Sequence, residues 1–141
     1  MSERIKNFLW LVLVLVIFGI ITFFRGSSSM YLDLEGNAIT VTAPENFVYS
    51  VPFEDIADIE LITGFESGTM ITGSKNRKFL WGTWENETLG QFTLCASQKI
   101  DNAILVKEIN GSILVFNYES SETTASLADM IPKLIESKLA P

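Results

Sequence analysis

The sequence contains no histidine and only one cysteine, Cys95. Histidine is the side chain whose unperturbed pKa places its charge change between about pH 5 and 8, and no nucleophile stands beside a base, so catalysis finds little support. A lone cysteine in an apolar context excludes a disulfide framework, and we expect a buried, unreactive thiol. The sequence therefore predicts no enzyme activity and no cofactor.

Basic residues are also scarce. The chain has ten lysines and arginines against seventeen aspartates and glutamates. Residues 26–141 hold seven basic and sixteen acidic side chains, which leaves this part with a net charge of −9. Such a surface is repelled by phosphate backbones and by anionic headgroups. We therefore expect no nucleic-acid partner.

Paired carboxylates are present, but they lack the setting that metal or acid–base chemistry needs. Calcium-binding loops place oxygen ligands at fixed offsets, and the sequence has no such loop. We therefore interpret the pairs as solvated strand and turn positions and expect no metal site. The pairs are Glu54 with Asp55, Asp58 with Glu60, and Glu85 with Glu87.

What the sequence does have is a long hydrophobic run near its beginning. Residues 8–24 carry no charge and would span roughly 25 Å as an α-helix. A cleaved signal peptide is one interpretation, but the run is long for one and is followed by bulky side chains instead of small ones. A buried core helix is a second, but no polar face appears at any period. We favour the third interpretation, an uncleaved transmembrane anchor at residues 1–25.

The flanks of this run predict its orientation. Two basic side chains precede it and only Arg25 follows closely, so the positive-inside rule places the N-terminus in the cytoplasm. Trp10, Phe23, Phe24 and Arg25 stand near the ends of the run, where aromatic and basic side chains prefer the membrane interface. The sequence thus predicts a single-pass protein of the cell membrane whose C-terminal domain lies outside the cytoplasm.

After a short linker at residues 26–29, residues 30–139 are predicted to form one small β domain. Short runs of β-branched and aromatic residues alternate with turn signals, which is typical of an antiparallel sandwich or barrel. Residues 64–78, rich in Gly, Ser and Thr, are predicted as the longest irregular connection. The predicted strands are residues 30–34, 38–42, 47–51, 58–63, 79–84, 91–97, 104–108 and 112–117, with one helical turn at 53–56.

The period of the apolar residues changes near the C-terminus and predicts one amphipathic helix. Ser120 or Ser121 can cap it. Pro132 has no amide hydrogen, so we expect it to kink the helix or to split it after Ile131. The apolar side chains at helical spacing are Leu127, Met130, Ile131, Leu134 and Ile135.

Strands followed by one C-terminal helix is the element order of the pleckstrin-homology superfold. The segment Val51-Pro52-Phe53-Glu54-Asp55-Ile56 resembles the opening motif of bacterial pleckstrin-homology-like domains. Gly82, the strand that begins at Gly90, and the hairpin at Asn110-Gly111 also resemble that family. The resemblance covers residues 30–138. It implies a mainly β fold, an antiparallel barrel or sandwich capped by one C-terminal α-helix.

The resemblance does not extend to a phosphoinositide site. Lipid-binding members of the wider superfold hold inositol phosphates with Lys and Arg in the first hairpin. This sequence has Asp33 and Glu35 there. Recognition of a phosphoinositide at that hairpin is therefore not expected.

Two tryptophans in one short segment are the candidates for a binding surface. Trp81 and Trp84 lie three positions apart and should point to opposite faces of a strand, so we expect one to be buried and the other exposed, unless a bulge near Gly82 intervenes. We favour a structural role for both, in which the neighbouring glycines permit sharp bends of a small barrel and each indole fills a large volume. An exposed indole would form an aromatic and basic patch suited to a carboxylate-bearing partner. The cations of this patch are Lys75, Arg77 and Lys78.

Two functions of different classes are consistent with these observations. The first is a membrane-anchored interaction module that binds a protein or peptide partner at the bilayer surface. The second is a lipid-sensing or small-ligand-sensing domain that uses the mouth of the barrel as its pocket. A hydrolase is a distant third, and a structural accessory subunit is the remaining alternative.

Overall fold

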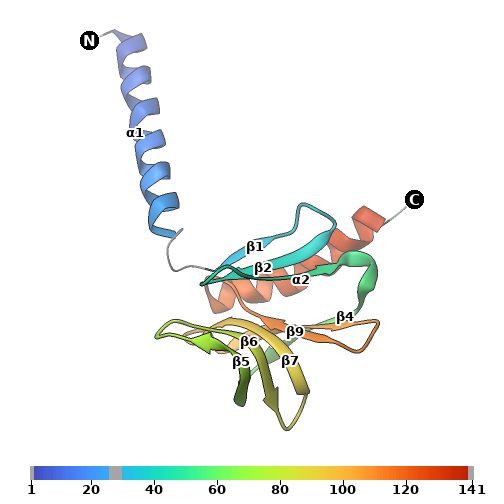
Figure 1. Cartoon of the computed structure of the whole chain (residues 1–141). Helices are drawn as coiled ribbons and strands as arrows, with labels where there is room; N and C mark the ends of the chain where they lie inside the picture. The colour runs from blue at the N-terminus through green and yellow to red at the C-terminus, as the bar shows by residue number, and fades with distance from the viewer. Residues whose placement is uncertain (1, 26–29, 140–141) are drawn as a thin grey trace.

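A computed structural model describes residues 2–25 and 30–139 of the chain, and for residues 17–25 it describes the backbone without the side chains (Figure 1). The predicted linker at residues 26–29 lies outside the described part. The elements are α1 (Glu3–Arg25), β1 (Tyr31–Asp33), β2 (Ala38–Ala43), β3 (Phe47–Pro52), η1 (Phe53–Asp55), β4 (Ile56–Thr63), β5 (Thr69–Lys75), β6 (Phe79–Asn86), β7 (Gly90–Ser97), β8 (Asn102–Glu108), β9 (Ile113–Phe116) and α2 (Ser121–Leu139).

The strands form two sheets, and α2 packs beside them (Figure 1). The smaller sheet has the order β1-β2-β3, and the larger has the order β4-β8-β9-β7-β6-β5. A mainly β domain with a C-terminal helix is therefore confirmed. The predicted helical turn is also confirmed, since η1 follows Pro52 and its last residue leads directly into β4.

The larger sheet contains one parallel pair, which the prediction of an antiparallel domain missed. β7 and β9 run parallel, with Leu94 beside Val115, whereas every other described pair is antiparallel. The chain leaves β7, crosses to β8 next to β4, and returns through a tight hairpin as β9. β9 thereby enters the gap between β8 and β7, and the reversal at the hairpin makes it parallel to β7.

The prediction of an irregular connection over residues 64–78 is wrong, because β5 (Thr69–Lys75) occupies its middle. β5 has few apolar side chains and is almost wholly exposed, so it shows no alternating pattern. Its pairing with β6 depends on Gly73, which lies opposite Gly82. A side chain at Gly73 would place its Cβ 2.2 Å from the Trp81 carbonyl oxygen, so the close approach of these strands requires glycine.

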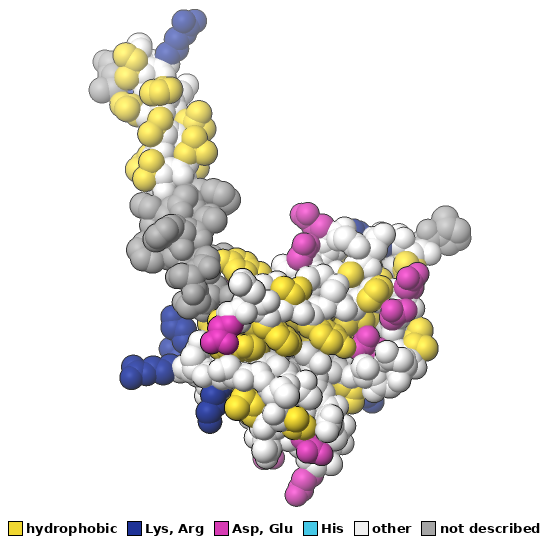
Figure 2. Space-filling model, in the orientation of Figure 1, with side chains coloured by type: hydrophobic (Ala, Val, Ile, Leu, Met, Phe, Trp, Pro, Cys, Tyr) yellow, Lys and Arg dark blue, Asp and Glu magenta, His cyan; other side chains and the backbone are white. Residues whose placement is uncertain are grey.

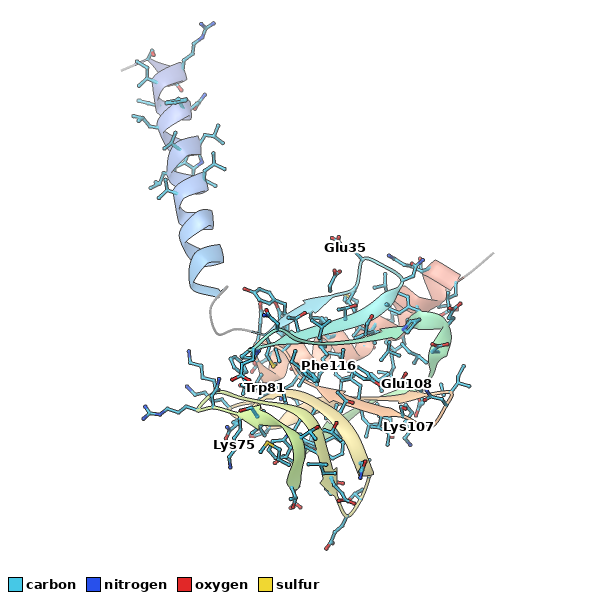
Figure 3. The ribbon with its side chains drawn as sticks, in the orientation of Figure 1. Glu35, Lys75, Trp81, Lys107, Glu108 and Phe116 are labelled. Atoms are coloured by element: carbon cyan, nitrogen blue, oxygen red, sulfur yellow. The ribbon has the colours of Figure 1, made fainter. Side chains whose placement is uncertain are left out.

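The main core fills the space between the two sheets and α2. Its largest members include Phe53, Trp81, Phe116 and Ile131, and Trp81 and Phe116 point into this space in Figure 3. Every one of these four side chains is at most 4% exposed. Burial of such large apolar side chains contributes about 2 kcal/mol or more each, which makes this cluster the principal source of stability.

A second core lies on the other face of the larger sheet. β4 and β5 are the two edge strands of this sheet, and only the short loop of residues 64–68 connects them. The sheet therefore curls so that its two edges approach each other at one end. Trp84, Phe92, Leu94 and Leu105 are among the buried side chains inside the curl. The curl is open between the 64–68 loop and the β6–β7 turn, and we call this opening, a hollow of about 940 Å³, the mouth.

The C-terminal helix begins as predicted but does not split at Pro132. Ser120 Oγ accepts a hydrogen bond from the Thr123 N–H at 3.0 Å, as expected of an N-cap. The helix continues to Leu139 because Ile131 and Ile135, on either side of the proline, pack against the same core. Met130 is 45% exposed and does not belong to the buried face, contrary to the prediction.

The predicted single-pass location is wrong. Within the described residues, no helix combines the length and the mean hydropathy that crossing a bilayer requires. The uncharged run in α1 would span roughly 25 Å, less than a hydrocarbon core of about 30 Å. In α1, Trp10 is 67% exposed, and the side chains of the other predicted interface residues, Phe23, Phe24 and Arg25, lie outside the described part.

A partly buried hydrogen bond between two side chains joins the two sheets at the end opposite the β5–β6 turn. Tyr49 of β3 donates its phenolic hydrogen to Glu108 Oε2 of β8 at 2.7 Å. Burial, and then the neighbouring Glu108 carboxylate, raise the pKa of Tyr49 to about 12 because both disfavour the phenolate. Since folding raises this pKa, the stabilisation is complete below the unfolded pKa of about 10 and is lost as the pH rises through 12.

We therefore expect Tyr49 to ionise late when phenolate absorbance is followed during an alkaline titration. Tyr49→Phe should remove this late transition and reduce the loss of stability between pH 10 and 12. In the control Tyr31→Phe, whose tyrosine is exposed, the late transition should persist. A late transition of the same amplitude in Tyr49→Phe and in the wild-type chain would show that the sheets are not joined in this way.

Candidate functional site

The β5–β6 turn carries three exposed cations on a constrained backbone. Asn76 Oδ1 accepts hydrogen bonds from the backbone N–H groups of Lys78 and Phe79, each at 2.8 Å. The Asn76 N–H in turn donates to the Phe79 carbonyl at 2.9 Å. Asparagine turns of this kind are held by their own side chain. Lys75, Arg77 and Lys78 are thus presented from a turn whose conformation is fixed locally.

Gln98, in the turn between β7 and β8, ties that turn to the first one. Its backbone N–H donates to the Lys78 carbonyl at 2.7 Å, and its Nε2 donates to the Asn76 carbonyl at 2.6 Å. The next residue, Lys99, is consequently a neighbour of Lys78, and both border one pocket. We call Lys75, Arg77, Lys78 and Lys99 the basic cluster.

The basic cluster occupies one end of the domain. Figure 2 shows Lys and Arg side chains gathered on the side where the β5–β6 turn lies, and in Figure 3 Lys75 points away from the core. Two ion pairs form within the described residues, Lys107 with Glu60 at 3.7 Å and Lys133 with Asp129 at 3.2 Å. Neither involves the basic cluster. Its cations therefore concentrate positive potential on an otherwise acidic domain.

An apolar pocket of about 220 Å³ lies beside the basic cluster. Met30 belongs to the main core, Phe79 packs against that core, and both supply part of the pocket wall. Among the described residues, Glu119 is the one carboxylate that lines the pocket. The pocket thus offers apolar surface between two lysines. Its lining is formed by Met30, Tyr31, Lys78, Phe79, Ser97, Lys99, Ile100, Tyr118 and Glu119.

The prediction that one tryptophan is exposed is wrong. Trp81 and Trp84 do point to opposite faces, since Trp81 packs in the main core and Trp84 in the second core. Each is nevertheless only 4% exposed, because the larger sheet curls and covers the face that carries Trp84 as well as the face that carries Trp81. The Trp84 indole N–H donates to the Trp81 carbonyl at 3.1 Å. The aromatic surface beside the cations comes from Phe79 and the pocket instead.

Sequence reasoning missed Lys99 and the pocket. The cations at positions 75, 77 and 78 lie within four consecutive residues and form a visible cluster, whereas Lys99 stands alone after a strand. Its position beside Lys78 depends on the hydrogen bonds that Gln98 makes to the β5–β6 turn. No local sequence pattern predicts these hydrogen bonds. Met30 and Tyr118 reach the same pocket from opposite ends of the domain sequence.

The first hairpin has the acidic character that the sequence predicts. Asp33 Oδ1 accepts a hydrogen bond from the Glu35 N–H at 2.9 Å, and Lys138 Nζ donates to the Glu35 carbonyl at 3.0 Å. In Figure 3 Glu35 lies at the outer end of this hairpin. A phosphate group would meet negative charge here.

The remaining reactive groups are arranged as structural residues. Cys95 is 1% exposed, and burial raises the pKa of its thiol to about 12, so the nucleophilic thiolate is disfavoured. Its Sγ lies 3.5 Å from Met30 Sδ. Among the side chains that the structure describes, no three from His, Cys, Asp and Glu are grouped so as to hold a metal ion. The predicted carboxylate pairs are all exposed, with Glu54 and Asp55 in η1, Asp58 and Glu60 in β4, and Glu85 and Glu87 at the end of β6 and in the turn after it.

Two sheets packed face to face with one C-terminal helix, together with the Pro52-led turn before β4, define a pleckstrin-homology-like domain. A family model described as bacterial PH domain matches residues 29–119, and the chain belongs to this family. PH domains are typically non-catalytic modules that bind proteins or lipids. No curated protein and no solved structure matches the chain.

Proposed function

We propose that this PH domain binds a protein partner by a peptide segment that carries carboxylates, and that the basic cluster and its pocket form the site. The observation that carries the proposal is the juxtaposition of four cations with apolar surface on a chain whose net charge is −7. Carboxylates of the peptide would pair with the cations, and Arg77 can hold one through two parallel hydrogen bonds. An apolar side chain would enter the pocket between Lys78 and Lys99.

The size of the pocket favours a peptide over a complete small ligand. Sites for small molecules and cofactors usually enclose about 300 to 1,000 Å³. The pocket of about 220 Å³ is smaller and suits one or two side chains. A peptide that extends beyond it can reach Lys75 and Arg77 on the neighbouring turn.

The rigidity of the turn also supports recognition. Binding loses affinity when flexible groups must be ordered. Asn76 and Gln98 already hold the backbone that carries three of the cations. Ordering on binding is therefore confined to the side chains themselves.

Charge reversal at the basic cluster tests this proposal. The probe is a fluorescein-labelled peptide with three glutamates and two leucines, and its binding to the full chain is followed by fluorescence anisotropy. We expect Lys75→Glu combined with Lys78→Glu to weaken binding at least about tenfold, because two attractive pairs become repulsive ones. Both positions are exposed, so the fold should be retained.

The matched control is Lys133→Glu combined with Lys138→Glu, which makes the same charge change on α2. This variant should bind the peptide within about twofold of the wild-type chain, once salt screens long-range effects. Equal weakening in both variants would indicate attraction to overall charge and would refute a defined site.

Sensing of a lipid or small ligand at the mouth is the second candidate. The volume of the mouth, about 940 Å³, favours it. The acidic side chains around the mouth oppose it for phosphate-bearing lipids, because they would repel the headgroup. A ligand there would have to be neutral or cationic.

A further inference from the structure

The mouth has an apolar floor. Ile62, Phe65 and Leu89 are partly buried and pack against the second core, and Leu105 belongs to that core. The Phe65 ring meets the Phe92 ring edge to face, with centroids 5.7 Å apart and an interplanar angle of 78°. The floor is therefore continuous with packed apolar residues and presents carbon surface to whatever enters the mouth.

The two walls of the mouth are joined to each other. Asn86 Nδ2 donates to the Glu66 carbonyl at 2.8 Å, and Asn86 Oδ1 accepts from the Leu89 N–H at 2.7 Å. Gly68 lies directly on the end of β6, since a Cβ at this position would stand 2.0 Å from the Glu85 carbonyl oxygen. These contacts fix the 64–68 loop against the β6–β7 turn, so the mouth is a preformed hollow.

The rim of the mouth is acidic. Glu66 comes from one wall, Glu85 and Glu87 come from the other, and all three are exposed. Neither ion pair of the described residues involves them, and no lysine or arginine lines the mouth. Figure 2 shows acidic side chains at the lower tip of the domain, where the β6–β7 turn lies in Figure 1.

We propose that the mouth docks a basic peptide segment of a protein partner. An apolar side chain would rest on Phe65 and Leu89, and neighbouring Lys or Arg side chains would pair with the rim carboxylates. Charge complementarity selects this occupant, because the rim repels anions and the net charge of −9 on residues 26–141 steers cations toward it. An apolar centre inside a polar rim is the usual anatomy of a protein–protein interface.

This site is independent of the proposed function at the basic cluster. Phe79 borders the small pocket and Glu85 borders the mouth, at the two ends of β6. At about 3.4 Å per residue the two sites are roughly 20 Å apart along the strand. A domain with both sites could hold two segments of opposite charge at once.

The test uses the full chain and a fluorescein-labelled peptide with three arginines and two leucines, followed by fluorescence anisotropy. Replacing Glu66, Glu85 and Glu87 together with glutamine is expected to weaken binding at least about tenfold, since three exposed ion pairs are lost. A peptide with serine in place of both leucines should also bind at least about tenfold more weakly, because it leaves the apolar floor uncovered.

Two controls decide the outcome. Glu54→Gln, Glu122→Gln and Glu136→Gln together remove the same charge elsewhere and should change affinity less than about twofold. Lys75→Glu with Lys78→Glu should leave the arginine peptide bound, whether or not the acidic peptide is lost. Failure of the wild-type chain to bind, or equal weakening by both glutamine variants, overturns the proposal. Self-association of the wild-type chain in sedimentation that the rim variant abolishes would identify a second copy as the occupant and also overturn it.

Discussion

Gly82→Ala is expected to lower the free energy of unfolding by at least about 3 kcal/mol, a large effect for the addition of one methyl group. Gly82 has φ +113° and Gly73, opposite it, has φ +110°. A Cβ on Gly82 would lie 2.3 Å from the Thr72 carbonyl oxygen and 2.5 Å from the Gly73 Cα. These are backbone atoms, so relief would require separation of β5 from β6.

Two other glycines provide graded controls for this prediction. Gly36 has open space around it and no positive φ, so Gly36→Ala should change stability by less than about 0.5 kcal/mol. Gly90 also has open space but has φ +71°, so Gly90→Ala should cost about 1 kcal/mol from backbone strain alone. Urea unfolding of the three variants measures the series. Similar losses for Gly82→Ala and Gly90→Ala would contradict the close pairing of β5 and β6.

Trp84→Ala is expected to cost about 3 to 5 kcal/mol, the usual range for the loss of a large buried aromatic side chain. Trp84 is 4% exposed among the second core residues, and its indole N–H is satisfied by the Trp81 carbonyl. The substitution leaves a cavity inside the curl of the sheet. Urea unfolding measures the loss, and Trp10→Ala, which removes a 67% exposed indole, should leave stability unchanged within about 0.5 kcal/mol.

The same pair of variants separates a core role from a binding role. A core residue lowers stability when it is truncated, and a surface anchor lowers affinity while stability is retained. If Trp84→Ala kept its stability and lost the acidic peptide, Trp84 would be part of the binding surface and its burial in the second core would be incorrect.

Local elements of the fold follow from the sequence because local physics determines them. The Asn110-Gly111 turn, the stop at Pro52 and the cap at Ser120 each act within a few residues, and all three are found where they were predicted. β5 was missed because its own residues show no strand pattern and its position is determined by pairing with β6. β5 is exposed along nearly its whole length and pairs with β6 where Gly73 lies opposite Gly82, a contact that the propensities of residues 69–75 do not reveal.

Some features of the candidate site were likewise predictable from the sequence, and others were not. Three cations lie within four consecutive residues, so their clustering on one turn was predictable, although the site itself stays a proposal. The burial of both tryptophans was not predictable from the alternation of side chains along a strand. Alternation tells which face of the sheet a side chain is on, whereas the curl of the sheet decides whether that face is covered. Pro132 is a similar case, since packing of Ile131 and Ile135 on one core outweighs the missing backbone hydrogen bond.

The most direct test of the account is a titration of the uniformly ¹⁵N-labelled full chain with the acidic peptide, followed by amide chemical shifts. An interaction module that uses the basic cluster predicts shifts that saturate at Lys75, Arg77, Lys78 and Lys99 and at the pocket residues Phe79 and Ile100, with the amides of the mouth unchanged. Shifts confined to the mouth, or no saturable shift at the basic cluster, would contradict it.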